Sequence, residues 1–238
     1  MTGSIPAERA RLPLGRKAYS RIAHLPGSRT GPADRTCTPE LARWCLENPR
    51  KNETVLVHEK LDGSCVAVAR IGGEVVALGR EGRRADASPN EGRQRFGRWV
   101  SQREALFAQL LRDGEWVAGE WLALAHGTRY ALAHEPFVAF DLFTAGERAT
   151  HDVLLERLGG ELQPAALLHR GGALPVAAAL ELLGERGRHG AIDPAEGVVY
   201  RLEREGRVTG LAKYVRPGKV DGSYLPENTG RPPVWNVR

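Results

Sequence analysis

The sequence predicts an α+β fold with largely antiparallel sheets and flanking helices. Alternating apolar runs flank short turns at Gly72-Gly73 and at Glu205-Gly206, and this pattern is typical of β-hairpins. Segments with helical spacing are inserted between the hairpins, which favours antiparallel over parallel sheets. The 238 residues, 42% hydrophobic and 26% charged, have the balance of a globular chain that is long enough to bury a core.

The first elements follow from local signals. Residues 1–35 are rich in proline, glycine and arginine without a sustained period, and we expect an irregular arm packed on the domain. Thr38 can cap a helix whose first residue is Pro39. The run ETVLVHEK, residues 53–60, is typical of a strand.

The remaining elements are predicted from periodicity in the same way. Phe96, Trp99, Val100, Leu106 and Leu110 lie on roughly one helical face, which predicts a single helix over 90–112. The other predicted segments are strands at 65–71, 74–80, 116–124, 136–143, 195–204 and 207–215, helices at 151–158 and 174–186, and an extended segment at 162–171.

Composition narrows the function classes only in part. The net charge of +5 and the pI of about 9.4 fit a polyanionic partner, and they fit equally a chain that uses arginine as a solubilising residue. Cys37, Cys45 and Cys65 lie far apart without a CxxC pair, which argues against a zinc cluster or a disulfide framework. No apolar run reaches membrane-spanning length and the N-terminus lacks a signal-peptide core, so we expect a cytoplasmic protein without a membrane partner.

Six short segments at strands or strand ends carry polar groups that packing does not require. Each has a structural explanation by itself, such as a strand-to-turn junction, a solvent-facing strand residue or a packed aromatic ring. Together they give the order K-D-G, R, E, F-D, E-G and K along the chain. The segments are 60–63, 79–82, 119–122, 137–141, 196–199 and 211–216.

This order resembles motifs I, Ia, III, IIIa, IV and V of the covalent nucleotidyltransferase superfamily, over Val57 to Arg216. The superfamily contains ATP-dependent DNA ligases, RNA ligases and mRNA capping enzymes. Cys65 stands where DNA ligases and capping enzymes usually have arginine, and both KxDGS and the string HLPGSR, residues 24–29, resemble the RNA-ligase branch. Only 22 residues follow Arg216, too few for the OB-fold of DNA ligases and capping enzymes.

The resemblance implies a nucleotidyltransferase (ATP-grasp-like) catalytic domain over 36–216, a nucleotide pocket between its sheets, and a C-terminal tail over 217–238. It also implies an ATP-dependent RNA ligase that forms lysyl-AMP and joins 3′-hydroxyl and 5′-phosphate RNA ends. Lys60 would be the nucleophile and Lys213 an α-phosphate contact. A lysine with the ordinary pKa of about 10.4 is protonated at neutral pH, so neighbouring cations must disfavour its charge before it can attack.

The implied site draws on the motif residues and their neighbours. Motif V commonly holds two lysines separated by one residue, and Lys213, the one lysine present, could fill either position while Arg216 compensates. The nucleotide-binding set is Glu59, Asp62, Gly63, Arg80, Glu120, Phe140, Glu196, Lys213 and Arg216. The ligands for Mg²⁺ (or Mn²⁺) are Asp62, Glu120 and Glu196. The RNA-binding candidates are Arg21, Arg29, Arg83 and Arg84.

Other functions remain open from the sequence. A DNA ligase or a capping-type guanylyltransferase would use the same motifs. A nucleotidyltransferase-fold RNA-binding protein without ligation activity is disfavoured, because the two lysines and two glutamates that chemistry needs are all present. A nucleotidyltransferase that modifies proteins or small molecules also fits. RNA end-healing proteins are possible partners of a ligase.

Overall fold

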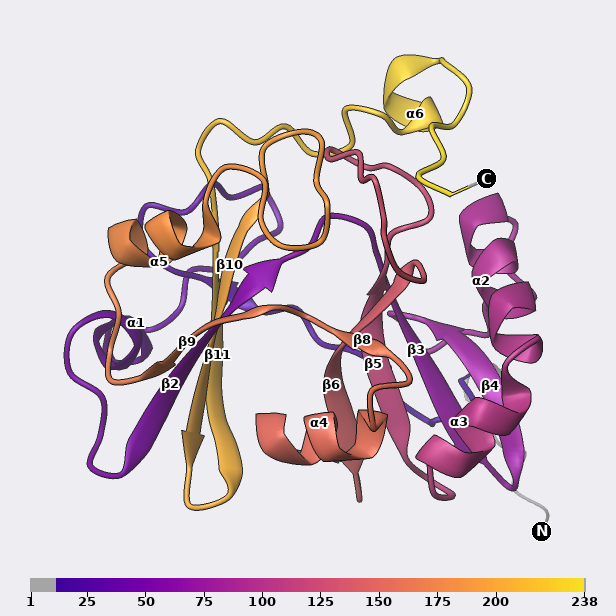
Figure 1. Ribbon diagram of the computed structural model, residues 1–238, viewed down its shortest axis with the longest axis horizontal. Coiled ribbons are helices and arrows are strands. Elements are labelled where there is room, and N and C mark those ends of the chain that lie inside the picture. The colour runs from indigo at the N-terminus through magenta and orange to yellow at the C-terminus, as the bar shows by residue number, and fades with distance from the viewer. Residues whose placement is uncertain (1–11, 238) are drawn as a thin grey trace, which may run out of the picture. The chain divides into compact units, whose positions relative to one another are not determined.

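The computed structural model describes residues 12–237, which fall into two compact units (Figure 1). The first unit contains residues 12–20, 65–121 and 139–162. The second unit contains residues 21–64, 122–138 and 163–237. Each unit is built on a sheet of mostly antiparallel strands, which confirms the predicted α+β class.

The second unit contains a five-stranded sheet with the order β1-β11-β10-β2-β9. Strand β10 pairs antiparallel with β11 and β2, and β9 pairs antiparallel with β2, whereas the two-residue β1 runs parallel to β11. The turn between β10 and β11 uses positive φ angles at Glu205 and Gly206, and the predicted hairpin is confirmed. The strands are β1 (Ala23–His24), β2 (Glu53–Lys60), β9 (Leu167–Gly171), β10 (Gly197–Arg204) and β11 (Arg207–Val215).

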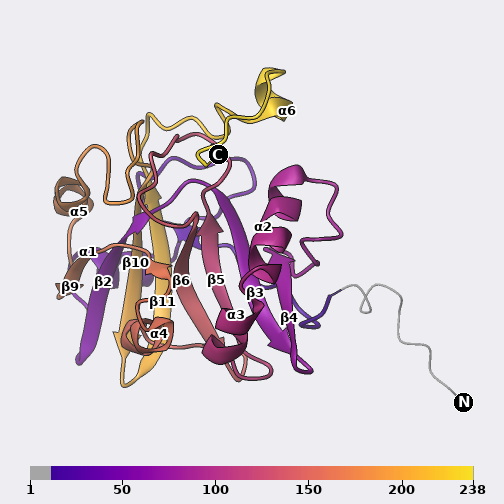
Figure 2. The same ribbon diagram turned by 45° about the vertical axis from the view of Figure 1, so that its right-hand side comes forward.

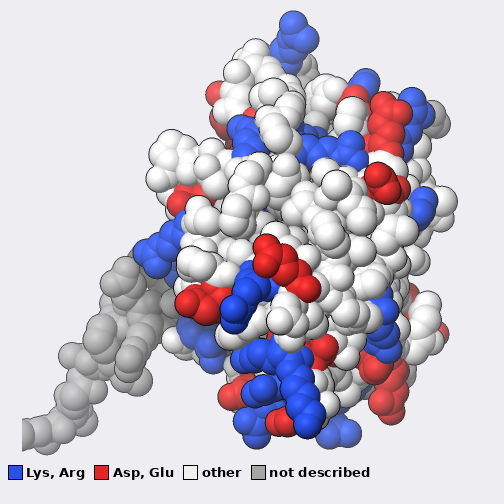
Figure 3. All heavy atoms as spheres, turned by 90° about the vertical axis from the view of Figure 1, so that its left-hand side faces the viewer, with Lys and Arg blue, Asp and Glu red and all other residues white. Residues whose placement is uncertain are grey.

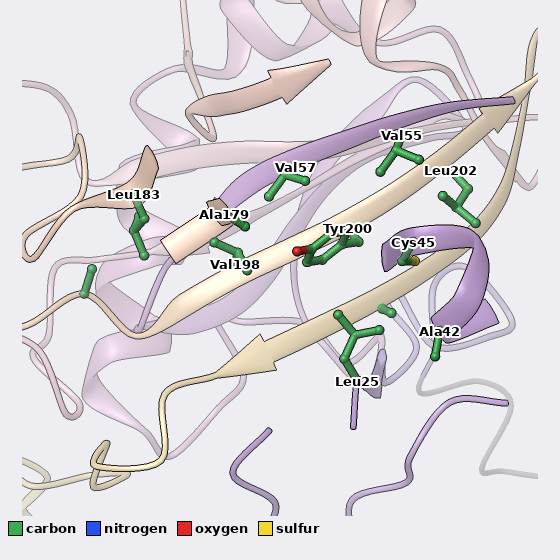
Figure 4. Close-up of a cluster of buried hydrophobic side chains, with 12 residues drawn as sticks. Leu25, Ala42, Cys45, Val55, Val57, Ala179, Leu183, Val198, Tyr200 and Leu202 are labelled. Atoms are coloured by element: carbon green, nitrogen blue, oxygen red, sulfur yellow. The ribbon is translucent and has the colours of Figure 1, made fainter. Parts of the chain in front are cut away.

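Helices α1 (Pro39–Leu46) and α5 (Val176–Leu183) cover one face of this sheet (Figures 1 and 4). The Thr38 hydroxyl accepts a hydrogen bond from the Leu41 N–H at 3.3 Å, so α1 begins where the capping signal predicts. The Tyr200 ring is fully buried and its hydroxyl donates to the Leu174 carbonyl, which satisfies the polar end of a core side chain. The cluster drawn in Figure 4 includes Val55, Val57, Val198 and Leu202 of the strands, Ala42 and Cys45 of α1, and Ala179 and Leu183 of α5.

The first unit contains a sheet with the order β4-β3-β5-β6-β7, and helices α2 and α3 pack beside β4 (Figures 1 and 2). The predicted hairpin between β3 and β4 is confirmed, with positive φ at Gly72 and Gly73. The strands are β3 (Ser64–Ile71), β4 (Glu74–Gly79), β5 (Trp116–Trp121), β6 (Phe137–Thr144) and β7 (Glu147–Arg148), and the helices are α2 (Glu91–Ser101), α3 (Glu104–Leu110) and α4 (His151–Leu158).

The single helix predicted over 90–112 is wrong, because α2 and α3 are separate. One continuous helix would place Arg103 on the same apolar stripe as Phe96, Val100 and Phe107. In the structure Arg103 leaves the helical conformation at φ −123° and ψ 23°, and its guanidinium lies over the Trp99 ring at 4.6 Å. The break thus keeps a charged side chain out of the core while Phe107 stays buried.

Parts of the predicted arm and tail are ordered elements of the fold. Residues 1–11 of the arm lie outside the described residues, whereas residues 12–35 supply β1 and the buried Leu25. Residues 217–237 carry α6 (Pro226–Thr229), and the extended segment predicted at 162–171 forms β8 (Gln163–Pro164) and β9. The domain boundaries at 36 and 216 stay predictions. None of the helices in residues 12–237 has the length and apolar character that crossing a membrane requires.

Candidate active site

Three strands of the second unit bring the segments that resemble motifs I, IV and V to one end of its sheet. Gly197, the first residue of β10, lies opposite Lys60 at the end of β2 and opposite Val215 at the end of β11. A side chain at Gly197, where φ is 158°, would collide with the Tyr214 carbonyl oxygen, so the close approach of β10 and β11 requires glycine here. Antiparallel pairing of neighbouring strands therefore places motif residues from distant parts of the chain together.

Lys60 forms an ion pair with Glu196 at this end of the sheet. The Lys60 Nζ donates to the Glu196 Oε2 at 2.5 Å, and Glu196 is only 6% exposed. Burial raises the pKa of the Glu196 carboxyl, and the adjacent Lys60 charge opposes the rise. Successive side chains of a strand point to opposite faces of the sheet. The register of β2, β10 and β11 therefore puts Lys60 and Lys213 on the same face, opposite to the face that α1 and α5 cover.

Asp62 is held by groups from two other segments. Its Oδ2 accepts hydrogen bonds from the Gly127 N–H at 3.1 Å and the Thr128 hydroxyl at 3.1 Å, and it lies 3.0 Å from the Lys219 Nζ. The Asp62 N–H donates to the Tyr130 hydroxyl at 3.0 Å. Sequence reasoning missed these partners, because they lie in loops without a periodic pattern.

Glu59 occupies a buried cradle on the other face of β2. The Glu59 Oε2 accepts a hydrogen bond from the Arg188 N–H at 2.7 Å, and the Oε1 has no hydrogen-bond partner among the described residues. A Cβ at Gly187 would collide with the carboxylate, so the loop after α5 closes tightly over it. Burial raises the pKa of Glu59 to about 7.

The string HLPGSR lies against the motif V strand. His24 pairs in register with Lys213, and its ring Nδ1 lies 2.7 Å from the Ser28 Oγ while its Nε2 lies 3.2 Å from the Asp34 Oδ2. Burial and then the Lys213 charge lower the pKa of His24. Burial raises the pKa of Asp34, but the Gly31 N–H and Lys213 outweigh it and the net shift is downward. Lys213 is therefore within electrostatic reach of His24 and Asp34.

The other arginines predicted in the second unit have separate surroundings. The Arg216 Nη2 donates to the Gly184 carbonyl at 2.5 Å, and its buried Nε has no partner within residues 12–237. Arg29 pairs with Asp221 at 2.6 Å, and Arg21 donates to the Ala33 carbonyl at 3.2 Å. Figure 3 shows basic and acidic side chains interspersed over the side that it presents.

The predicted residues of the second, third and fourth segments belong to the first unit. Arg80 follows β4, and its carbonyl accepts a hydrogen bond from the Tyr19 N–H at 3.0 Å. Glu120 lies on β5 and Phe140 on the neighbouring β6. The Phe140 ring meets the Tyr19 ring edge-on at 4.9 Å, and the Tyr19 hydroxyl donates to Asp141 at 2.6 Å.

The predicted RNA contacts of the first unit lie in the turn after β4. The Gly79 N–H donates to the Arg83 carbonyl at 2.8 Å, and the Arg84 side chain pairs with Glu74 at 3.0 Å and Asp86 at 3.2 Å. Two acidic neighbours thus offset the charge of Arg84. The structure brings the predicted residues together as two sets, one in each unit.

A metal site built by protein ligands alone does not form in the described chain. Within residues 12–237, no group of three or more His, Cys, Asp or Glu side chains is placed to hold a metal ion. Glu196 is paired with Lys60, and Asp62 with Lys219. The carboxylates therefore fit Mg²⁺ only as one or two ligands of an ion that also takes phosphate oxygens and water, a common mode for this ion.

A family model and several solved structures match this chain. The RNA ligase family model matches residues 53–215. A Naegleria gruberi RNA ligase solved with PPi is similar in structure, with a TM-score of 0.54, 16% identity, and coverage of 97% of this chain and 64% of that one. A lysine-to-alanine variant of the N. gruberi ligase, solved with ATP and Mn, gives a TM-score of 0.53 and 15% identity. The match covers 90% of this chain and 64% of that one.

An archaeal ATP-dependent RNA ligase gives a TM-score of 0.48 and 20% identity, and covers 75% of this chain and 45% of that one. The search of curated proteins found no match. The chain thus spans less than two thirds of the length of these solved ligases. Because the family model matches more than half of the chain, from β2 to the end of β11, the protein belongs to the RNA ligase family.

Proposed function

We propose that this protein is an ATP-dependent RNA ligase whose nucleophile is Lys60. The observation that carries the proposal is the pair of Lys60 and the buried Glu196, set where β2, β10 and β11 end side by side in a chain of the RNA ligase family. The solved N. gruberi ligase with ATP and Mn supports the choice of nucleotide and of a divalent cation.

The first chemical step begins with loss of a proton from Lys60. The ammonium form that pairs with Glu196 cannot attack, and the Glu196 Oε2 at 2.5 Å is placed to accept the proton. The free amine attacks the α-phosphorus of ATP, a nitrogen–phosphorus bond forms, and the bond to the β-phosphate breaks with pyrophosphate as the leaving group. Lys213, on the same face, neutralises the charge that develops on the α-phosphate oxygens.

The remaining contacts follow from the two sets of residues. In the second unit, Asp62 and Gly63 lie beside the nucleophile. Glu59 stays among the proposed nucleotide contacts only through its place next to Lys60 in the chain, because its carboxylate is buried on the opposite face of β2. In the first unit we assign Phe140 to stacking on the base. The other proposed nucleotide contacts are Arg80, Glu120 and Arg216. A bound Mg²⁺ or Mn²⁺ would supply phosphate charge neutralisation, with one or two of the candidates Asp62, Glu120 and Glu196 as its protein ligands.

The later steps use RNA. AMP passes from Lys60 to a 5′-phosphate end, and a 3′-hydroxyl then displaces AMP and seals the strand. Arg21, Arg29, Arg83 and Arg84 are the proposed phosphate contacts. A cytoplasmic location and cooperation with RNA end-healing proteins are part of the same proposal.

The test is the intact mass of the protein after incubation with ATP and Mg²⁺. The wild type should gain the mass of AMP, and Lys60→Ala should not. Lys51→Ala is the matched control, because it removes an exposed lysine from the same unit. An AMP adduct on Lys60→Ala would refute the nucleophile assignment.

Substrate choice is tested separately. Labelled ATP and labelled GTP distinguish a ligase from a capping-type guanylyltransferase, and a covalent adduct with GTP alone would refute the ligase proposal. A panel of 5′-phosphorylated nicks in RNA and in DNA should show preferential sealing of RNA. Preferential sealing of DNA would identify a DNA ligase.

A further inference from the structure

Lys219 is a buried lysine that no motif contains. It is 8% exposed, although it lies in a loop after the last strand of the sheet. Its Nζ donates to the Gly127 carbonyl at 2.7 Å and to the Thr128 hydroxyl, and it lies 3.0 Å from the Asp62 Oδ2. A buried ammonium is tolerated only where such partners compensate for lost hydration. The burial of Lys219 therefore depends on the Gly127 carbonyl, the Thr128 hydroxyl and the Asp62 carboxylate.

The chain around Lys219 is fixed by backbone pairing to the loop that follows β5. The Tyr224 N–H donates to the His126 carbonyl at 2.7 Å, and the Ala125 N–H donates to the Val234 carbonyl at 2.9 Å. The Asn236 side chain donates to the Leu122 carbonyl at 2.7 Å. Residues 217–237 are thus anchored beside the loop that holds Asp62.

The ion pair of Lys219 and Asp62 lies close to the nucleophile in the chain. Asp62 is two residues after Lys60, in the short segment 61–63 that connects β2 to β3. Lys219, the Gly127 N–H and the Thr128 hydroxyl fix the Asp62 carboxylate, and the Tyr130 hydroxyl accepts from the Asp62 N–H. These contacts hold the segment that directly follows Lys60, so loss of the Lys219 contact would loosen the orientation of the nucleophile.

We propose that Lys219 is a positioning residue for lysine adenylylation, which compensates the charge of Asp62 and holds the turn over residues 61–63 so that Lys60 keeps its orientation. Lys219 acts through Asp62 rather than by touching the reacting atoms. The role rests on the proposed function, because it presumes that Lys60 attacks ATP.

The experiment measures single-turnover formation of the AMP adduct over a range of ATP concentrations. Lys219→Met should lower the maximal rate at least about tenfold and change the ATP concentration for half-maximal rate much less, as expected when orientation rather than binding is lost. Lys219→Arg should recover part of the rate, because it keeps the charge. Lys51→Met, at an exposed position of the same unit, should match the wild type.

A double-mutant cycle with Asp62→Asn isolates the pair. Because the double variant leaves no buried unpaired charge, it should unfold at a higher temperature than Lys219→Met alone. A Lys219→Met protein with the wild-type maximal rate would overturn this role and leave the proposed function intact. A wild type that forms no adduct would overturn the proposed function and this role together.

Discussion

Replacing Glu59 by glutamine should remove a large pH dependence from the stability of the protein. Burial raises the pKa of the folded-state carboxyl from 4.5 to about 7. The folded state therefore binds more protons than the unfolded state between these values, and the free energy of unfolding falls as pH rises through them. At about 1.4 kcal/mol per pH unit, the full loss is about 3 kcal/mol. The amide of Glu59→Gln has no such titration.

The assay is urea unfolding of the wild type and Glu59→Gln at several pH values between 5 and 8. Glu59→Gln lowers the free energy of unfolding by an amount that is the same at every pH in this range, because the amide does not titrate. The loss itself arises because the NH₂ group takes the place of the unpartnered Oε1. The wild type should lose about 2–3 kcal/mol relative to the variant across this range, which is a shift of the urea midpoint by about 1 M. Glu185→Gln, at an exposed position in the same unit, is the control.

Two results would refute this reasoning. If the difference in unfolding free energy between wild type and Glu59→Gln stayed constant from pH 5 to pH 8, Glu59 would not be a protonated buried acid. If the control Glu185→Gln removed the pH dependence as Glu59→Gln does, the titration would not belong to the Glu59 carboxyl.

Three further substitutions test the packing and polar contacts of each unit. Gly127→Ala should cost about 1–3 kcal/mol in chemical unfolding, because its Cβ would collide with the backbone beside Lys219, whereas Gly172→Ala, with open space around it, should cost less; equal losses would contradict this contact. Tyr19→Phe should destabilise the protein by about 1.5–3 kcal/mol in thermal unfolding through loss of the buried bond to a carboxylate, and an unchanged melting temperature would show that the bond contributes nothing. Ser28→Ala should cost about 1 kcal/mol and slow adduct formation, because the hydroxyl accepts from the backbone of the motif V strand; a wild-type rate would remove the HLPGSR turn from site support.

The two hairpins and the first helix were predictable from sequence because their signals are local. Turns at Gly72-Gly73 and Glu205-Gly206 depend on residues that tolerate positive φ, and the cap at Thr38 depends on a residue three positions away. The order of the motifs can likewise be read along the chain without a structure, which is why the RNA ligase family could be predicted.

The helix break at Arg103 shows where periodicity misleads. The apolar spacing continues through this position, so the pattern predicts one helix over 90–112. The tertiary structure ends α2 before Arg103, because a guanidinium on the core stripe would lose its hydration, and stacking on Trp99 keeps it at the edge. The competing free energies are set by three-dimensional burial, which spacing does not encode.

The sequence by itself determined the class of the fold, the strands that carry the motifs and the family to which the chain belongs. Only the tertiary structure decided which charges meet: Lys60 and Glu196 are 136 residues apart in the chain and 2.5 Å apart in space, and Lys219 reaches Asp62 from a loop beyond the sheet. Propensities and turn signals act between near neighbours, whereas the partner of a buried charge is chosen when the sheet closes and removes it from water.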